Sequence, residues 1–132
     1  MGDRVSGAAI VLIDHGSREA AANTVVEEVA AALRERLPGR AVEVAHLELA
    51  APDLAEAVAR CASSGAREVV VLPFFLAPGR HSARDIPRLA AAAAERHPGV
   101  SIRVAPPLGA HPAIVDAVLD RLSESAGPPR RG

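Results

Sequence analysis

Four short apolar runs alternate along the chain with four segments of helical periodicity. The runs at 8–13 and 69–72 are apolar throughout, as in strands covered on both faces, whereas 42–47 and 100–104 are mixed, as in edge strands. Because strand and helix alternate, the sequence predicts an α/β fold: a single doubly wound, mostly parallel sheet of four strands with helices on both faces. The predicted helices cover 22–37, 52–65, 85–97 and 112–122.

The apolar fraction of the chain comes from small and aliphatic side chains. Hydrophobic residues make up 49% of the sequence but aromatic residues only 2%, so Ala, Val, Leu and Ile must build the core. The formal net charge of -1 argues against nucleic-acid binding, which usually needs a basic excess. The single cysteine, Cys61, excludes an intrachain disulfide and a multi-cysteine zinc site, and we place it in the core.

The hydrophobic pattern also indicates the compartment. No apolar run approaches the roughly 18–20 residues that span a bilayer, and the N-terminus lacks the apolar stretch of a signal peptide. We therefore expect a cytoplasmic protein without membrane contact. The length suits one domain, which we assign to residues 1–124. The remaining residues, 125–132, are rich in Gly, Pro and Arg and are expected to form a disordered tail.

Polar residues follow each predicted strand. In open parallel sheets, ligands bind outside the carboxyl ends of the strands, where the connections reverse direction. With the strand order 2-1-3-4, the segments after the first and third strands flank this point. His15 and His81 lie on these two segments, and Glu48 follows the second strand. Two imidazoles and a carboxylate suit a borderline divalent metal such as Co²⁺, Fe²⁺, Ni²⁺ or Zn²⁺, with positions left open for a substrate.

The positions of His15, His81 and Glu48 can also be explained without a catalytic or metal-binding role. His15 and His81 could be hydrogen-bonded loop residues, and Glu48 a solvated acid ahead of the second helix. His46, at the end of the second strand, is interpreted as a packed strand residue. The sequence leaves these alternatives open.

Helix ends explain several further polar residues. His97 lies where it complements the dipole of the third helix, and His111 where it precedes or caps the fourth. Ser17 is predicted to cap the first helix, and Ser82 or Asp85 the third.

Arginines gather near the same edge of the predicted sheet, at positions 18, 80, 84 and 88. Guanidinium groups bind carboxylates and phosphates in a bidentate manner, so the cluster suits a polycarboxylate or phosphate ligand. The chain contains no lysine, so the preference for arginine is a general bias, and only the clustering is informative.

Three segments together resemble the class II tetrapyrrole chelatases, and in particular the small sirohydrochlorin chelatases of the CbiX/SirB type. They are VLIDHGSR at 11–18, LELAAPDL at 47–54 and VLPFFLAPGRHSARDIP at 71–87. The His-Gly-Ser element is weak alone, but its combination with the third segment is specific. The resemblance extends from about Ala8 to Leu122 and includes LGAHP at 108–112.

The resemblance implies a chelatase-like, flavodoxin-like three-layer sandwich that inserts Co²⁺ or Fe²⁺ into sirohydrochlorin, in cobalamin or sirohaem biosynthesis, without ATP. It implies no cofactor beyond the substrate metal, although Ni²⁺ and Zn²⁺ also suit the site. His15 and His81 carry over as metal ligands and proton carriers, and Glu48 as a third ligand. A chain that matches one such domain is expected to form a homodimer around the substrate. The residues expected to bind the tetrapyrrole are Ser17, Arg18, Phe75, Arg80 and Arg84.

Two other functions compete with this one. A protein of the same fold could bind or deliver metal without chelatase activity, and only an assay separates the two. A histidine-nucleophile phosphatase would need Arg-His-Gly after the first strand, but Asp14 precedes His15 here, which disfavours that chemistry.

Overall fold

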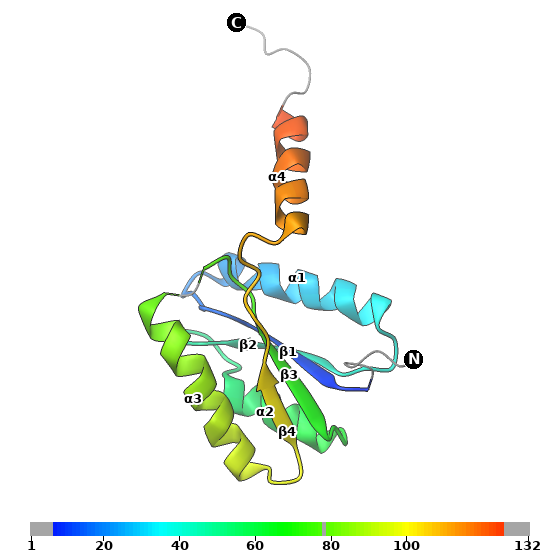
Figure 1. Cartoon of the computed structure of the whole chain (residues 1–132), viewed down its shortest axis with the longest axis vertical. Helices are drawn as coiled ribbons and strands as arrows, with labels where there is room; N and C mark the ends of the chain where they lie inside the picture. The colour runs from blue at the N-terminus through cyan, green and yellow to red at the C-terminus, as the bar shows by residue number, and fades with distance from the viewer. Residues whose placement is uncertain (1–6, 78, 126–132) are drawn as a thin grey trace, which may run out of the picture.

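The computed structural model describes residues 7–77 and 79–125, except for the side chains of Arg80, His81 and Ala83 (Figure 1). Four strands form one parallel sheet in the order β2-β1-β3-β4, which confirms the predicted fold class and strand order. In chain order the elements are β1 (Ala9–Asp14), α1 (Ala20–Arg36), β2 (Val42–His46), α2 (Leu54–Ser63), β3 (Glu68–Pro73), α3 (Arg80–Arg96), β4 (Ser101–Val104) and α4 (Pro112–Ser125).

Helices cover both faces of the sheet. Successive side chains of a strand point to opposite faces, so Val11 and Ile13 of β1 pack in one apolar cluster with α2 and α3. Leu12, between them, packs with α1 in a second cluster. As the composition predicts, the core is aliphatic, and Cys61 lies fully buried within it.

Three helix starts differ from the sequence prediction, those of α1, α2 and α3. α2 begins at Leu54 rather than Pro52, because Asp53 caps it. The Asp53 carboxylate accepts a hydrogen bond from the Glu56 backbone N–H, and the Glu56 carboxylate accepts one from the Asp53 backbone N–H. α1 begins at Ala20 with Glu19 as its N-cap, so the prediction that Ser17 caps this helix is wrong. Ser17 Oγ instead accepts a hydrogen bond from the Glu19 N–H, one residue before the helix.

The third helix was expected from Asp85 but begins at Arg80. Gly79 is its N-cap and makes no side-chain hydrogen bond, so the start has no capping residue to mark it in the sequence. Ser82 and Asp85 therefore lie inside α3, and neither caps it. Pro87 also lies inside the helix, although proline is favoured near a helix start.

α4 is set apart from the layers of the fold. Figure 1 shows it projecting past the carboxyl ends of the strands, away from the other three helices. None of its residues is buried. None of the helices in the described part of the chain is long and apolar enough to cross a bilayer. The predicted tail at 125–132 falls, from residue 126 on, outside the described residues.

Candidate functional site

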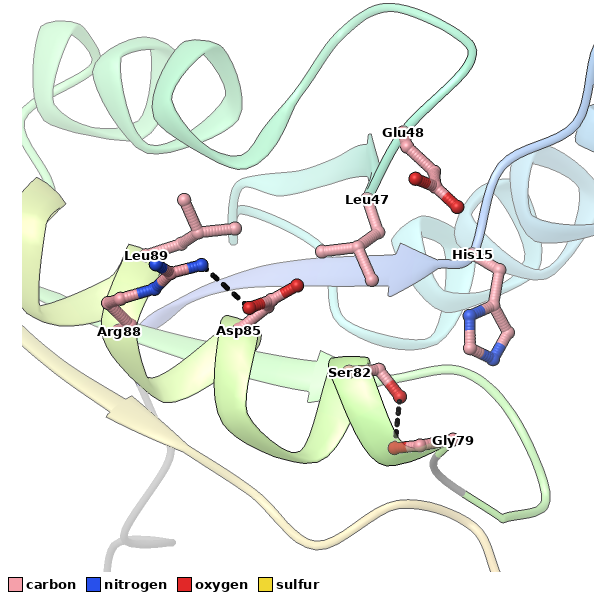
Figure 2. Close-up of a pocket in the computed structure, with 8 residues that line it drawn as sticks. All are labelled: His15, Leu47, Glu48, Gly79, Ser82, Asp85, Arg88 and Leu89. Carbon is pink, nitrogen blue, oxygen red and sulfur yellow. Dashed lines mark hydrogen bonds and ion pairs between the residues drawn. The ribbon is translucent and has the colours of Figure 1, made fainter.

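A cleft of about 440 Å³ opens at the carboxyl edge of the sheet, between the loops after β1 and β2 and one side of α3 (Figure 2). It is found where the strand order predicts a ligand site, beside the point where the connections reverse. The residues that line it are His15, Leu47, Glu48, Gly79, Ser82, Asp85, Arg88 and Leu89. The cleft therefore brings together two of the three residues expected to bind metal, His15 and Glu48.

Backbone contacts hold these two residues together. Glu48 N–H donates to the His15 carbonyl at 3.1 Å, and Leu47 N–H donates to the Asp14 carbonyl at 2.9 Å. Gly16, at φ 88°, makes this approach possible, because a Cβ built there would lie 1.8 Å from the Glu48 carbonyl oxygen. The two loops are thus joined by their main chains, while the side chains of His15 and Glu48 are both exposed.

The His15 ring is oriented by an aromatic neighbour. It stacks on Phe75, with ring centroids 4.5 Å apart and an interplanar angle of 22°. Phe75 follows β3, whose loop is attached to the sheet by a 2.7 Å hydrogen bond from Phe74 N–H to the Ile13 carbonyl. Figure 2 shows the His15 ring and the Glu48 carboxylate at the same end of the cleft. This end therefore presents an imidazole and a carboxylate to the solvent-filled space.

The opposite end of the cleft carries an ion pair. Arg88 donates to the Asp85 carboxylate at 2.6 Å, from one turn of α3 to the next (Figure 2). Asp85 was interpreted from the sequence only as a helix cap, and its place in the cleft was missed. The signal was the helical spacing of 82, 85 and 89, which becomes visible once α3 is extended back to Arg80.

A hydrogen-bonded polar pair lies at the carboxyl ends of β1 and β2, just before the cleft loops in the chain. Nδ1 of His46 and Oδ1 of Asp14 are 2.6 Å apart, and His46 is only 2% exposed. The two residues are partners in the register of β1 and β2. The interpretation of His46 as a packed strand residue agrees with this burial, but no sequence pattern marks Asp14 as its partner.

The remaining predicted site residues are not among those that line the cleft in the described structure. Arg80 and His81 belong to the first turn of α3, beside the cleft residues Gly79 and Ser82, but their side chains lie outside the described part of the structure. Ser17, Arg18 and Arg84 do not line the cleft, and both arginines are exposed. The Ser17 N–H donates to the Asn23 side chain at 3.0 Å, which ties this loop to α1.

Among the described side chains, no group of three His, Cys, Asp or Glu lies close enough together to hold a metal ion. His15 and Glu48 thus form an open, partial ligand set. Cys61 does not add to it, since it lies in the core, where burial raises the pKa of its thiol to about 11. His111 accepts a 3.0 Å hydrogen bond from the Ala113 N–H at the start of α4, which agrees with its interpretation as a cap.

Comparisons with known proteins identify relatives of the whole fold. The CbiX family model matches residues 9–125. The chain is 44% identical over 113 residues to the chloroplastic sirohydrochlorin ferrochelatase of Arabidopsis thaliana, a match that covers 86% of this chain and 50% of the plant protein. It is 37% identical over 139 residues to the sirohydrochlorin cobaltochelatase of Methanopyrus kandleri, covering 90% of this chain and 97% of the archaeal one.

Solved structures of CbiX and SirB proteins have a similar fold. A cobalamin biosynthesis CbiX protein from Marinobacter aquaeolei superimposes with a TM-score of 0.77 at 34% identity, over 89% of this chain and 95% of that one. The sirohydrochlorin chelatase SirB of Bacillus subtilis subspecies spizizenii, in complex with cobalt, superimposes with a TM-score of 0.80 at 29% identity. That match covers 88% of this chain and 50% of SirB. The chain thus spans half the length of some relatives and nearly all of others.

Proposed function

Because the chain belongs to the CbiX family, we propose that it is a sirohydrochlorin chelatase, an enzyme that inserts Co²⁺ or Fe²⁺ into sirohydrochlorin without ATP. The named relatives support this activity. They do not distinguish between the two metals, since they include a ferrochelatase and a cobaltochelatase. The observation that carries the proposal is the position of His15, exposed at one end of the carboxyl-edge cleft and joined through its backbone to Glu48.

The chemistry of insertion suits this pair. A metal ion can enter the macrocycle only if two pyrrole protons leave, so the site needs ligands that release the metal and groups that accept protons near neutral pH. Imidazole does both. We propose that His15 and His81 hold the incoming metal and accept the protons, and that Glu48 assists as a third ligand. An incomplete set is an advantage here, because a closed site of four protein ligands would retain the metal.

The rest of the proposed site binds the macrocycle. Sirohydrochlorin carries several carboxylates, which we assign to Arg18, Arg80, Arg84 and the hydroxyl of Ser17. Phe75 supplies apolar surface for the flat ring and, by its stacking on His15, links the ring site to the metal ligand. In so aromatic-poor a chain, few other side chains can do this.

We further propose that the active form is a homodimer in the cytoplasm. One copy supplies one wall of the site, while a tetrapyrrole has two faces to cover. SirB, which is matched over only half of its chain, is about the size of two such units. The compartment remains a prediction from the sequence; the plant relative is named as chloroplastic.

The test is metal insertion measured directly. Purified protein is incubated with sirohydrochlorin and Co²⁺ or Fe²⁺, and the absorbance change of the macrocycle is followed against an enzyme-free control. We expect His15→Ala and His81→Ala each to reduce the rate by a factor on the order of 100 or more, with the circular dichroism spectrum unchanged. His97→Ala is the matched control, because His97 ends α3 at the opposite edge of the sheet.

A wild-type rate equal to the enzyme-free background would refute the chelatase. If the protein nevertheless bound Co²⁺ tightly in an equilibrium titration, it would be a metal-binding protein of the same fold. An insertion rate close to wild type in His15→Ala would show that the site is misplaced.

A further inference from the structure

The strands β1 and β2 end in a polar pair that lies at the base of both cleft loops. Asp14 is the last residue of β1 and His46 the last residue of β2. Nδ1 of His46 lies 2.6 Å from Oδ1 of Asp14, and the two side chains are only 3% and 17% exposed. His15 follows Asp14 directly, and Glu48 lies two residues after His46. Each member of the pair thus precedes one of the two proposed metal ligands at the same end of the cleft (Figure 2).

Two further contacts tie His46 to these loops. Its backbone N–H donates to the Pro52 carbonyl at 2.8 Å, which closes the loop that carries Glu48. Its Cβ lies 3.1 Å from the position that a Cβ on Gly16 would occupy, so His46 packs against the residue that follows His15. A displacement of His46 would therefore move both loops.

Stability alone is a weak explanation for a polar pair at this place. The strand residues that precede it, Leu12 and Ile13 in β1 and Val44 and Ala45 in β2, are buried and apolar. A buried hydrogen-bonded pair stabilises a fold little more than apolar side chains of the same shape, because both of its groups lose their hydration. It does impose a distance and a direction, which apolar packing does not. The pair is thus better explained by the geometry that it fixes.

The pair acts on the site through the backbone. Among the described side chains, no three His, Cys, Asp or Glu lie close enough to share a metal ion, so Asp14 and His46 do not complete a metal site with the cleft residues. The backbone path is short, since Leu47 N–H donates to the Asp14 carbonyl and Glu48 N–H to the His15 carbonyl. These two hydrogen bonds continue the pairing of β1 and β2 past the ends of the strands.

We propose that Asp14 and His46 are positioning residues of the metal site. Their hydrogen bond fixes the separation of the two strand ends, and the backbone hydrogen bonds beyond it carry that separation to His15 and Glu48. The stacking of His15 on Phe75 orients the imidazole ring, whereas the pair sets how far the ring lies from the carboxylate. This inference rests on the proposed function for the assignment of His15 and Glu48 as ligands.

The test compares three variants of the full chain. Asp14→Ala removes the hydrogen bond. Asp14→Asn retains it, since an amide both donates and accepts and so pairs with either tautomer of His46. Val69→Ala is the matched control: Val69 is fully buried near the amino end of β3, so its truncation destabilises the core away from the cleft. Urea denaturation establishes how far each variant is destabilised.

Amide hydrogen exchange, followed by NMR, reports on the loops without any metal. We expect Asp14→Ala to lower the protection of the Leu47 and Glu48 amides on the order of 10-fold relative to amides at the centre of the sheet. Val69→Ala should not single out these two amides, because it acts on global stability. Asp14→Asn should stay close to the wild type.

Equilibrium titration with Co²⁺ reports on the ligand set itself. We expect the dissociation constant of Asp14→Ala to rise on the order of 10-fold, as when a residue that supports metal ligands is removed. Asp14→Asn and Val69→Ala should bind Co²⁺ as the wild type does. In the insertion assay, the KM for Co²⁺ should rise in the same proportion in Asp14→Ala, with a smaller effect on kcat.

Wild-type protection of the Leu47 and Glu48 amides in Asp14→Ala would overturn the inference, whatever the stability of that variant. An Asp14→Asn variant as impaired as Asp14→Ala would overturn it too, because the hydrogen bond would not be the cause. If insertion were observed and Asp14→Ala changed neither measurement, the proposed function would stand without the positioning role. If the wild type inserted no metal but the exchange and affinity results held, the positioning role would stand and the chelatase would be refuted.

Discussion

Replacing Gly16 by alanine tests whether the site depends on the close approach of two loops. Gly16 has a φ of 88°, a value that residues with a Cβ rarely adopt. An added Cβ would lie 1.8 Å from the Glu48 carbonyl oxygen and 3.1 Å from Cβ of His46. The Glu48 oxygen belongs to the backbone, so the clash can be relieved only if one loop moves.

The cost of Gly16→Ala follows from two contributions. Holding alanine in the left-handed region costs about 1–2 kcal/mol. Moving the loops apart also weakens the hydrogen bonds from Leu47 and Glu48 to the carbonyls of Asp14 and His15, each worth about 1 kcal/mol. We expect the free energy of unfolding to fall by about 2–4 kcal/mol, measured by urea denaturation. The insertion rate should fall as well, because His15 and Glu48 lose their fixed separation.

Gly65→Ala separates the two contributions. Gly65 has a similar φ of 93°, but no atom lies within 4 Å of the position of an added Cβ. This variant therefore reports the conformational cost alone, about 1–2 kcal/mol, and should leave insertion unchanged. If Gly16→Ala were no more destabilising than Gly65→Ala and equally active, the contact between the loops would not position the site.

Three further predictions concern the structure around the cleft. Asp14→Ala leaves His46 buried without its partner and should lower the free energy of unfolding by about 2 kcal/mol in urea; an unchanged midpoint would contradict this. Asp53→Ala removes the cap of α2 and should cost about 1 kcal/mol in the same assay. Because burial raises the pKa of Cys61 from 9.0 to about 11, the folded state keeps its proton longer than the unfolded state. Stability should thus decline from pH 9 to 11, and less so in Cys61→Ala.

The order of the elements and the place of the site could be predicted because both depend on local patterns. Apolar runs and helical periodicity mark the strands and helices, and the carboxyl ends of parallel strands necessarily meet at one edge. His15 and Glu48 were therefore expected together and are found together. The pairing of Asp14 with His46 depends on strand register, which a single sequence does not contain. The start of α3 was missed because Gly79 offers no capping side chain.

The packing of α4 shows a different limit of sequence reasoning. The spacing of Val115, Val118, Leu119 and Leu122 establishes that one face of this helix is apolar, but the same pattern suits any apolar surface. Where this face lies depends on the direction that the chain takes after β4. That direction follows from backbone hydrogen bonds to Val71 and Phe75, residues distant in sequence. Periodicity thus predicts the apolar face of α4, whereas tertiary contacts that are distant in sequence place the helix.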